Sequence, residues 1–204
     1  LRQERLQRGL YRALVHRPGS QDQGILKYQT VGTWPANALM FHDPEQWPWA
    51  MRLADSWMKI LSEWIHLPGA RHRPWHQHAL YSGGWDVFGL YHQGTRFDEN
   101  CKAVPETTQL VESVPGLRTA GFSVLRAGSR IAPHVGYGDG VLRYHLGLLV
   151  PPGKLSCVLK VGSDFSPWRQ GGCIVFDDTV RHEAWNYSEL DRVVLLLDFE
   201  NKWK

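Results

Sequence analysis

Apolar residues in the first half of the chain recur with the period of a helix. Between Pro44 and His66, tryptophan, leucine and isoleucine return at steps of three and four, which places them on one face. Asp43 suits the N-cap position, with Pro44 opening the first turn, and a Pro-Gly pair at residues 68–69 ends the helix. We therefore predict one helix over this stretch, with its tryptophan-rich face packed on a sheet.

The second half of the chain carries the shorter apolar runs that are typical of strands. Turn residues separate these runs, and a short helix is expected at residues 105–114. Short strands at regular spacing favour a sandwich or barrel over β-α-β units. The expected strands cover residues 86–91, 120–125, 142–150, 155–161, 172–176 and 192–199.

Near residue 84 the helical pattern gives way to short apolar runs, and this change indicates how the chain is organised. We expect residues 1–83 to form a helical and loop region that begins with a short amphipathic helix over residues 1–17. Residues 84–204 are expected to form the β domain. We expect the first region to pack on this domain, so that the two make a single globular unit.

Composition excludes several classes of protein. The 204 residues are 43% hydrophobic and 21% charged, which excludes disorder, and no apolar run has the length of a membrane span. A net charge of +3 is too small to indicate nucleic-acid binding. The 3 cysteines form no CxxC pair, so neither a disulfide scaffold nor a zinc ribbon is expected. We expect a cytoplasmic protein, or one of the endoplasmic reticulum lumen if an anchor precedes Leu1.

Two histidines and one arginine are the main candidates for chemistry. His134 ends a strand before a glycine-rich turn, and His182 follows a buried strand, a separation that fits ligands on facing strands of a jelly roll. Arg192 opens the last apolar strand, where an unpaired guanidinium is costly to bury, so it requires an anionic partner such as a carboxylate. Two imidazoles, open coordination positions and this arginine point to non-haem Fe(II) with a 2-oxo acid co-substrate.

The sequence resembles the aspartyl/asparaginyl β-hydroxylase family of Fe(II)- and 2-oxoglutarate-dependent oxygenases over about residues 84–199. The segments that carry the resemblance are PGLRTAGFSVL (115–125), IAPHVGY (131–137), LRYHLGLLVP (142–151), WRQGGCIVFDDTVRHEAWN (168–186) and RVVLLLDF (192–199). The resemblance implies a mainly β fold. This fold is a double-stranded β-helix (a cupin-like jelly roll) with the N-terminal helical layer packed on the sheet.

The resemblance also implies roles for individual residues. His134 and His182 match the two iron ligands, and Arg192 matches the residue that holds the distal carboxylate of 2-oxoglutarate. The other residues implied to contact this co-substrate are Ser123, Arg143 and His145. Catalysis is therefore expected to depend on the two histidines and on Arg192.

Position 136 departs from the general pattern of these oxygenases. The usual metal-binding motif reads His-x-Asp/Glu, but Gly136 stands at its last position, as in the subset of the family that uses two histidines. A water molecule or Asp139 is left open as the occupant of the vacant position. Trp168, Asp177 and Asp178 belong to the family pattern, and we expect them to support the sheet and the iron-bearing turn.

The implied activity is that of an Fe(II)/2-oxoglutarate-dependent dioxygenase, which uses O2 to hydroxylate an unactivated carbon and releases succinate and CO2. The expected substrate carbon is the β-carbon of an aspartyl or asparaginyl residue, or of a related amino-acid, peptide or protein substrate. We expect an acidic substrate because the stretch 71–78, Arg126 and Arg130 are basic. Two alternatives remain: a halogenase that places chloride beside Gly136, or a catalytically silent jelly-roll binding module.

Overall fold

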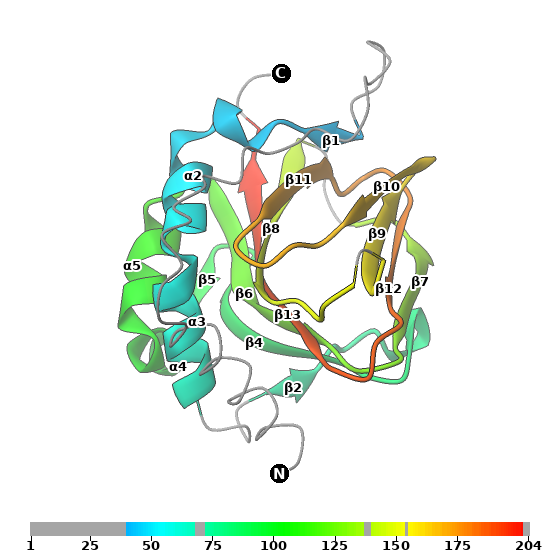
Figure 1. Ribbon diagram of the computed structural model, residues 1–204. Coiled ribbons are helices and arrows are strands. Elements are labelled where there is room, and N and C mark those ends of the chain that lie inside the picture. Colours follow the sequence, from blue (N-terminus) through cyan, green and yellow to red (C-terminus); the bar gives the residue numbers. More distant parts are fainter. Residues whose placement is uncertain (1–39, 68–71, 137–139, 154, 202–204) are drawn as a thin grey trace, which may run out of the picture. The chain divides into compact units, whose positions relative to one another are not determined.

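Two antiparallel sheets form the body of the protein (Figure 1). The computed structural model describes residues 40–67, 72–136, 140–153 and 155–201. In spatial order, the strands of the larger sheet are β1 (Phe41–His42), β11 (Cys173–Asp177), β8 (Val141–Leu149), β13 (Arg192–Glu200), β6 (Leu117–Leu125), β4 (Trp85–His92) and β2 (Arg73–Pro74), with β5 (Thr95–Arg96) paired to β4. The smaller sheet contains β10 (Asp164–Pro167), β9 (Cys157–Val161), β12 (His182–Asn186), β7 (Arg130–His134) and β3 (Tyr81–Ser82).

The apolar core lies between these sheets. The larger sheet contributes Leu125, Phe176 and Val194, and the smaller sheet contributes Leu159 and Val161, all of them buried. Removal of this apolar surface from water is the main force that holds the sheets together. The mainly β fold of the double-stranded β-helix type expected from the sequence is confirmed.

Helices cover the outer face of the larger sheet (Figure 1). The helical segments of this layer are η1 (Pro44–Gln46), α2 (Pro48–Asp55), α3 (Trp57–His66), α4 (Asp98–Ala103) and α5 (Pro105–Glu112). A further short helix, η3 (His78–Leu80), contacts β7 of the smaller sheet. Trp49 of α2 lies with its ring centroid 4.7 Å from that of Phe199, and Trp64 of α3 lies 5.0 Å from Phe122. The helical layer on the sheet is therefore confirmed, and it explains why β13 is apolar on both faces.

The prediction of one helix from Pro44 to His66 is wrong, because the segment divides into η1, α2 and α3. Trp47 is extended (φ −119°, ψ 103°) since the following proline disfavours helical backbone in the residue before it. A second break falls at Ser56 (φ −92°, ψ 6°), between α2 and α3. The cap is confirmed: the side chain of Asp43 accepts a hydrogen bond from the backbone N–H of Glu45 at 3.0 Å.

The expected strands all occur, with ends that differ by a few residues, and so does the helix of α5. Strands β2, β3, β5, β10 and β12 were not predicted; the first three are pairs of residues, which are too short to show an alternating pattern. No helix in the described ranges is long and apolar enough to cross a membrane. The helix expected at residues 1–17 lies outside the described residues, and the division of the chain at residue 84 stays a prediction.

Candidate active site

The two histidines predicted to bind iron lie side by side. His134 ends β7 and His182 begins β12, and the residues are register partners in the smaller sheet, with ring centroids 4.2 Å apart. They thus lie on neighbouring strands of one sheet, and not on facing strands. The register shifts directly after this pair, and such an irregularity is common where a strand presents a functional side chain.

Hydrogen bonds to the backbone fix the orientation of both imidazoles. Nδ1 of His134 lies 2.9 Å from the carbonyl oxygen of Ala132, and Nδ1 of His182 lies 2.8 Å from that of Val180. A carbonyl oxygen only accepts, so each Nδ1 carries the proton and each Nε2 keeps its lone pair. This is the arrangement by which proteins prepare histidines as metal ligands.

Burial keeps the two rings neutral. It lowers the pKa of His134, and it lowers the pKa of His182 to about 3, to which the neighbouring His134 also contributes. Only the neutral imidazole offers a lone pair to a metal ion. Both rings are therefore in the binding form at neutral pH.

A carboxylate fills the space beside Gly136. A Cβ atom built on Gly136 would overlap the side chain of Asp178, which is 3% exposed. Oδ1 of Asp178 lies 2.7 Å from Nη1 of Arg143 and 3.2 Å from Nε2 of His182. The sequence predicted only a supporting role for Asp178, and Asp139 lies outside the described residues.

Asp178 is held in an environment that disfavours its charge. Burial raises its pKa to about 6, although the positive charge of Arg143 opposes this effect. Its oxygen faces the lone pair of His182, so two electron-rich atoms lie close together. A proton or a metal cation between them would relieve their repulsion.

Arg143 is the hub of an ion-pair chain on the inward face of the larger sheet. Its Nε donates to Asp198 of β13 at 2.6 Å and its Nη2 donates to the other oxygen of the same carboxylate at 3.0 Å. Burial lowers the pKa of this guanidinium, but the Asp198 and Asp178 carboxylates outweigh burial and raise it. Arg143 therefore remains charged and ties β8 to β13 and to the turn that carries Asp178.

Three neighbouring buried side chains hold polar atoms without partners among the described residues; we call Arg192, His145 and Trp168 the donor cluster. Nε and Nη2 of Arg192, both ring nitrogens of His145 and Nε1 of Trp168 lack hydrogen bonds. The Arg192 guanidinium carbon lies 4.5 Å from the Trp168 ring centroid, and the His145 ring stacks on the same tryptophan at 5.8 Å.

The cost of burying these groups identifies what the donor cluster would bind. Burial lowers the pKa of Arg192 to about 10 and that of His145 well below its ordinary value. Unpaired buried donors are strongly unfavourable unless a ligand satisfies them. A ligand with a carboxylate would compensate the guanidinium, so the residues present fit a 2-oxo acid.

Ser123 lies on the same inward face of the larger sheet. Its hydroxyl accepts a hydrogen bond of 3.0 Å from Nε1 of Trp85, and it pairs in register with Val194 of β13. The ring of Trp85 lies 6.5 Å from that of His134. Trp85 therefore links the predicted co-substrate serine to the predicted iron ligand.

The same residues fit a metal site with few protein ligands. The described ranges contain no group of three or more His, Cys, Asp or Glu residues that could hold a metal ion. Two neutral histidines that each offer the lone pair of Nε2 would leave most positions of an octahedral ion open to a chelating co-substrate. The two-histidine metal site implied by the resemblance stays a prediction.

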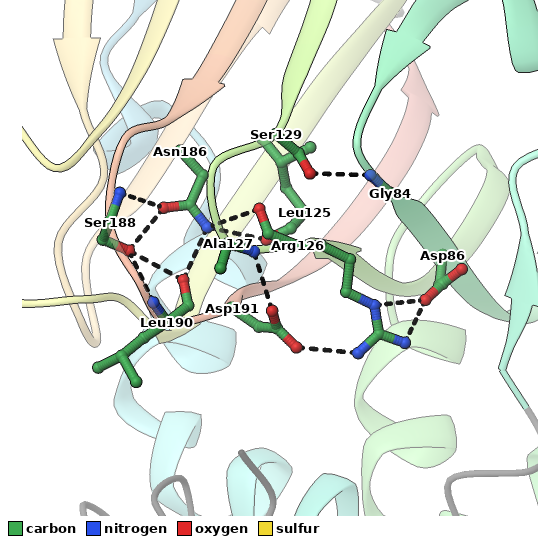
Figure 2. Close-up of polar contacts among 10 residues, drawn as sticks. All are labelled: Gly84, Asp86, Leu125, Arg126, Ala127, Ser129, Asn186, Ser188, Leu190 and Asp191. Atoms are coloured by element: carbon green, nitrogen blue, oxygen red, sulfur yellow. Dashed lines mark hydrogen bonds and ion pairs between the residues drawn. The ribbon is translucent and has the colours of Figure 1, made fainter. Parts of the chain in front are cut away.

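Two arginines that the sequence assigned to the substrate are occupied elsewhere. Arg126 forms ion pairs with Asp86 and with Asp191, the latter at 2.9 Å (Figure 2). Arg130 forms an ion pair of 2.7 Å with Glu183. These protein carboxylates neutralise both guanidinium groups, so neither supports the expectation of an acidic substrate.

Figure 2 also shows what Arg126 supports, the turn that leads into β13. The Asn186 side chain donates to the carbonyl oxygens of Leu125, Arg126 and Leu190. Asp191 accepts a hydrogen bond of 3.0 Å from the backbone N–H of Ala127. This network fixes the residue directly before Arg192.

Two curated relatives differ in how much of the chain they match. The ornithine lipid ester-linked acyl 2-hydroxylase of Rhizobium tropici is 33% identical over 182 residues, which is 85% of this chain and 63% of the relative. The human aspartyl/asparaginyl beta-hydroxylase is 33% identical over 121 residues, which is 57% of this chain and 16% of the relative. The chain thus spans less than two thirds of the length of either protein.

Solved structures support the fold. A Pseudomonas putida prolyl-4-hydroxylase superimposes with a TM-score of 0.50 at 16% identity and covers 73% of this chain and 88% of its own. A 2OG-Fe(II) oxygenase family protein from Burkholderia pseudomallei gives 0.50 at 13% identity, with 69% of this chain and 76% of its own covered. The fold is therefore shared with 2-oxoglutarate/Fe(II) oxygenases.

A match to a family model identifies the family as well as the fold. The model for aspartyl/asparaginyl beta-hydroxylase matches residues 54–202, the stretch that contains both histidines and the donor cluster. Because this match covers most of the chain, the protein belongs to the aspartyl/asparaginyl beta-hydroxylase family, a family of oxygenase-type hydroxylases.

Proposed function

We propose that this chain is an Fe(II)/2-oxoglutarate-dependent hydroxylase. The observation that carries the proposal is that the smaller sheet holds two oriented, neutral histidines and the larger sheet holds a buried guanidinium whose Nε and Nη2 are unpaired among the described residues. The two histidines would bind the metal, and the guanidinium of Arg192 would bind the co-substrate.

Each predicted residue has a distinct task in this proposal. His134 and His182 hold Fe(II) through Nε2, and the metal with 2-oxoglutarate and O2 supplies the oxidising power for insertion of an oxygen atom into a C–H bond. Arg192 and Ser123 hold the distal carboxylate of 2-oxoglutarate. His145, beside Arg192 and Trp168, would contact the same co-substrate. Arg143, whose guanidinium is paired with Asp198 and Asp178, would face it from the same strand and hold Asp178 in place.

The chain itself contributes orientation and exclusion of water. Arg192 and His145 are 1% and 7% exposed, so a charged co-substrate would be held away from bulk solvent, where its interactions are stronger. Asp178 would place a carboxylate beside the metal, although it does not stand at position 136, where the usual motif has its Asp or Glu. Arg143 keeps this carboxylate in place and Asp198 keeps Arg143 in place.

For the substrate, we propose a methylene group next to a carbonyl carbon. The β-carbon of an aspartyl or asparaginyl residue is such a group, and so is carbon 2 of an ester-linked acyl chain. The first is the substrate position in the name of the human relative, and the second is that in the name of the Rhizobium relative. Because the Rhizobium enzyme matches more of this chain, an ester-linked lipid is retained as a candidate substrate together with an amino acid or peptide.

The space beside Gly136 also bears on the halogenase alternative. A halogenase needs an empty position next to the metal for chloride, but the carboxylate of Asp178 occupies this space and would repel an anion. Product analysis with chloride or bromide present distinguishes the two activities. A halogenated product would replace the hydroxylase proposal.

The first test is an anaerobic titration of the chain with Fe(II) and 2-oxoglutarate. We expect the weak visible metal-to-ligand charge-transfer band, and we expect Arg192→Ala to require a concentration of 2-oxoglutarate at least about 10-fold higher, because a charge-assisted hydrogen bond is lost. Aspartyl peptides and an ornithine lipid are then compared as substrates by succinate release and product mass. A folded chain that binds neither Fe(II) nor 2-oxoglutarate would instead be the silent binding module.

A further inference from the structure

Trp168 has a buried donor that its structural surroundings do not explain. It follows β10, is 4% exposed, and its backbone N–H is bonded to the carbonyl oxygen of Cys157 at 3.2 Å. Its indole Nε1–H, however, has no partner among the described residues. A buried N–H group of this kind normally finds an acceptor.

A comparison with Trp85 shows that burial alone does not leave an indole N–H without a partner. Trp85 is equally exposed at 4% and belongs to the same core cluster, yet its Nε1 donates to the hydroxyl of Ser123. If Trp168 only filled space in the core, a phenylalanine would serve without the penalty of an unpaired donor. The unpaired N–H therefore points to an acceptor that the described part of the chain does not provide.

The neighbours of Trp168 indicate what this acceptor is. The guanidinium carbon of Arg192 lies 4.5 Å from the ring centroid, a distance at which the aromatic face attracts the cation. Arg192 itself has Nε and Nη2 unpaired. An acceptor that serves both side chains must be negatively charged and must offer more than one oxygen atom, as a carboxylate does.

We propose that Trp168 is a specificity-determining residue of the co-substrate site. Its Nε1–H donates to the distal carboxylate of 2-oxoglutarate beside Arg192, while its ring holds the guanidinium in position. This inference rests on the proposed function. A 2-oxo acid without the distal carboxylate leaves both donors unpaired, and sites built around buried donors reject such analogues strongly.

The test compares two ligands that differ only at this end. 2-Oxopentanoate has the carbon chain of 2-oxoglutarate with a methyl group in place of the distal carboxylate. Binding of each to the Zn(II)-loaded chain is measured by calorimetry for wild type and Trp168→Phe, which keeps an aromatic ring but lacks the N–H. We expect Trp168→Phe to weaken 2-oxoglutarate binding about 10-fold and to leave 2-oxopentanoate binding unchanged.

Trp49→Phe is the matched control. Trp49 is 5% exposed, lies on the outer face of the larger sheet against Phe199, and undergoes the same chemical change. It should leave the ratio of the two dissociation constants at the wild-type value. Equal weakening of both ligands by Trp168→Phe would show a purely structural role and would overturn the proposal.

A measurement on the wild-type chain removes the dependence on how the variant folds. In the Zn(II)-loaded protein, one indole N–H resonance should move downfield on addition of 2-oxoglutarate and stay in place with 2-oxopentanoate. If 2-oxoglutarate binds but moves no indole resonance, Trp168 is not a ligand contact and only this inference fails. If the wild type binds no 2-oxoglutarate, the proposed function fails with it.

Discussion

At Gly136, the absence of a side chain leaves room for the carboxylate of Asp178 between Arg143 and His182. In sequence the position reads as a lost metal ligand. In the structure a carboxylate is present beside the histidines, but it comes from a different turn. The two turns are tied by a hydrogen bond of 2.8 Å from the backbone N–H of Gly136 to the carbonyl oxygen of Asp178.

This arrangement predicts that residues 136 and 178 are strongly coupled. Gly136→Asp places a second carboxylate in occupied space, so we expect it to lower the free energy of unfolding by about 2 kcal/mol or more through steric overlap and charge repulsion. The double variant with Asp178→Ala should be more stable, by at least about 1 kcal/mol, than the sum of the two single effects predicts, because the overlapping group is removed. Urea denaturation of the single and double variants measures this coupling.

Gly128→Ala is the control for that cycle. Gly128 has φ +65° and no heavy atom within 4 Å of a built Cβ, so the substitution strains the backbone without creating an overlap. Its cost, about 1 kcal/mol, should be the same in the presence and absence of Asp178→Ala. Additive effects of Gly136→Asp and Asp178→Ala would contradict the occupied-space interpretation.

Among the elements, β13 and the turn before it connect the polar network of Figure 2 to the site. Asp191 ends the turn and Arg192 begins the strand, so the orientation of the guanidinium depends on how firmly the turn is held. Asp191 has a side chain only 4% exposed and bonds both Arg126 and the backbone of Ala127.

We predict that Asp191→Asn weakens binding of 2-oxoglutarate as well as stability. Loss of the charge should cost about 1 kcal/mol of unfolding free energy, a modest value because Arg126 is 42% exposed. The looser turn should raise the dissociation constant of 2-oxoglutarate about 3-fold or more. Calorimetric titration of the Zn(II)-loaded protein measures the second effect.

Asp86→Asn separates the two effects, since it removes the other carboxylate of Arg126. Asp86 lies on β4 and, unlike Asp191, is not part of the turn before Arg192. We expect a similar loss of stability with unchanged affinity for 2-oxoglutarate. If both variants weaken 2-oxoglutarate binding equally, the turn does not orient Arg192 and the ion pairs act only on overall stability.

Sequence reasoning worked at the level of elements where the pattern was long enough to be periodic. The continuous apolar run of β13 and the strands β6 and β8 were recognised because several consecutive residues agree. The break between η1 and α2 was missed, although Pro48 signalled it through its effect on Trp47. The break at Ser56 carries no comparable signal, because neither glycine nor proline stands there.

Across the whole molecule, the candidate site was identified by residue type but not by contact. His134, His182 and Arg192 were recognised because their chemistry stands out against apolar strands. The occupation of the space beside Gly136 and the unpaired nitrogen of Trp168 depend on which turns meet in three dimensions, and spacing along the chain does not encode this. Similarly, only the folded chain reveals that Arg126 is already neutralised.

The free energy of unfolding of the metal-free protein should depend on pH through His145. Burial, with the nearby charges of Arg192 and Arg143, lowers its pKa well below the ordinary 6.5. Above pH 6.5 the ring is neutral in both the folded and unfolded chain, so its contribution is fully present. Below that pH the unfolded chain takes up a proton that the folded chain cannot, and stability falls by about 1.4 kcal/mol per pH unit.

The Asp178–His182 pair does not cancel this effect near pH 5. The pKa values of about 6 and about 3 mean that the folded pair holds one proton, on Asp178, while the unfolded pair holds one proton on His182. We therefore expect His145→Gln to lose about 2 kcal/mol less stability than wild type between pH 7.5 and pH 5. Urea denaturation at several pH values, with a chelator present, gives the change of unfolding free energy with pH for wild type and variant. Because His134 contributes equally to wild type and variant, identical slopes would mean that the buried ring of His145 takes up its proton as readily in the folded chain as in water.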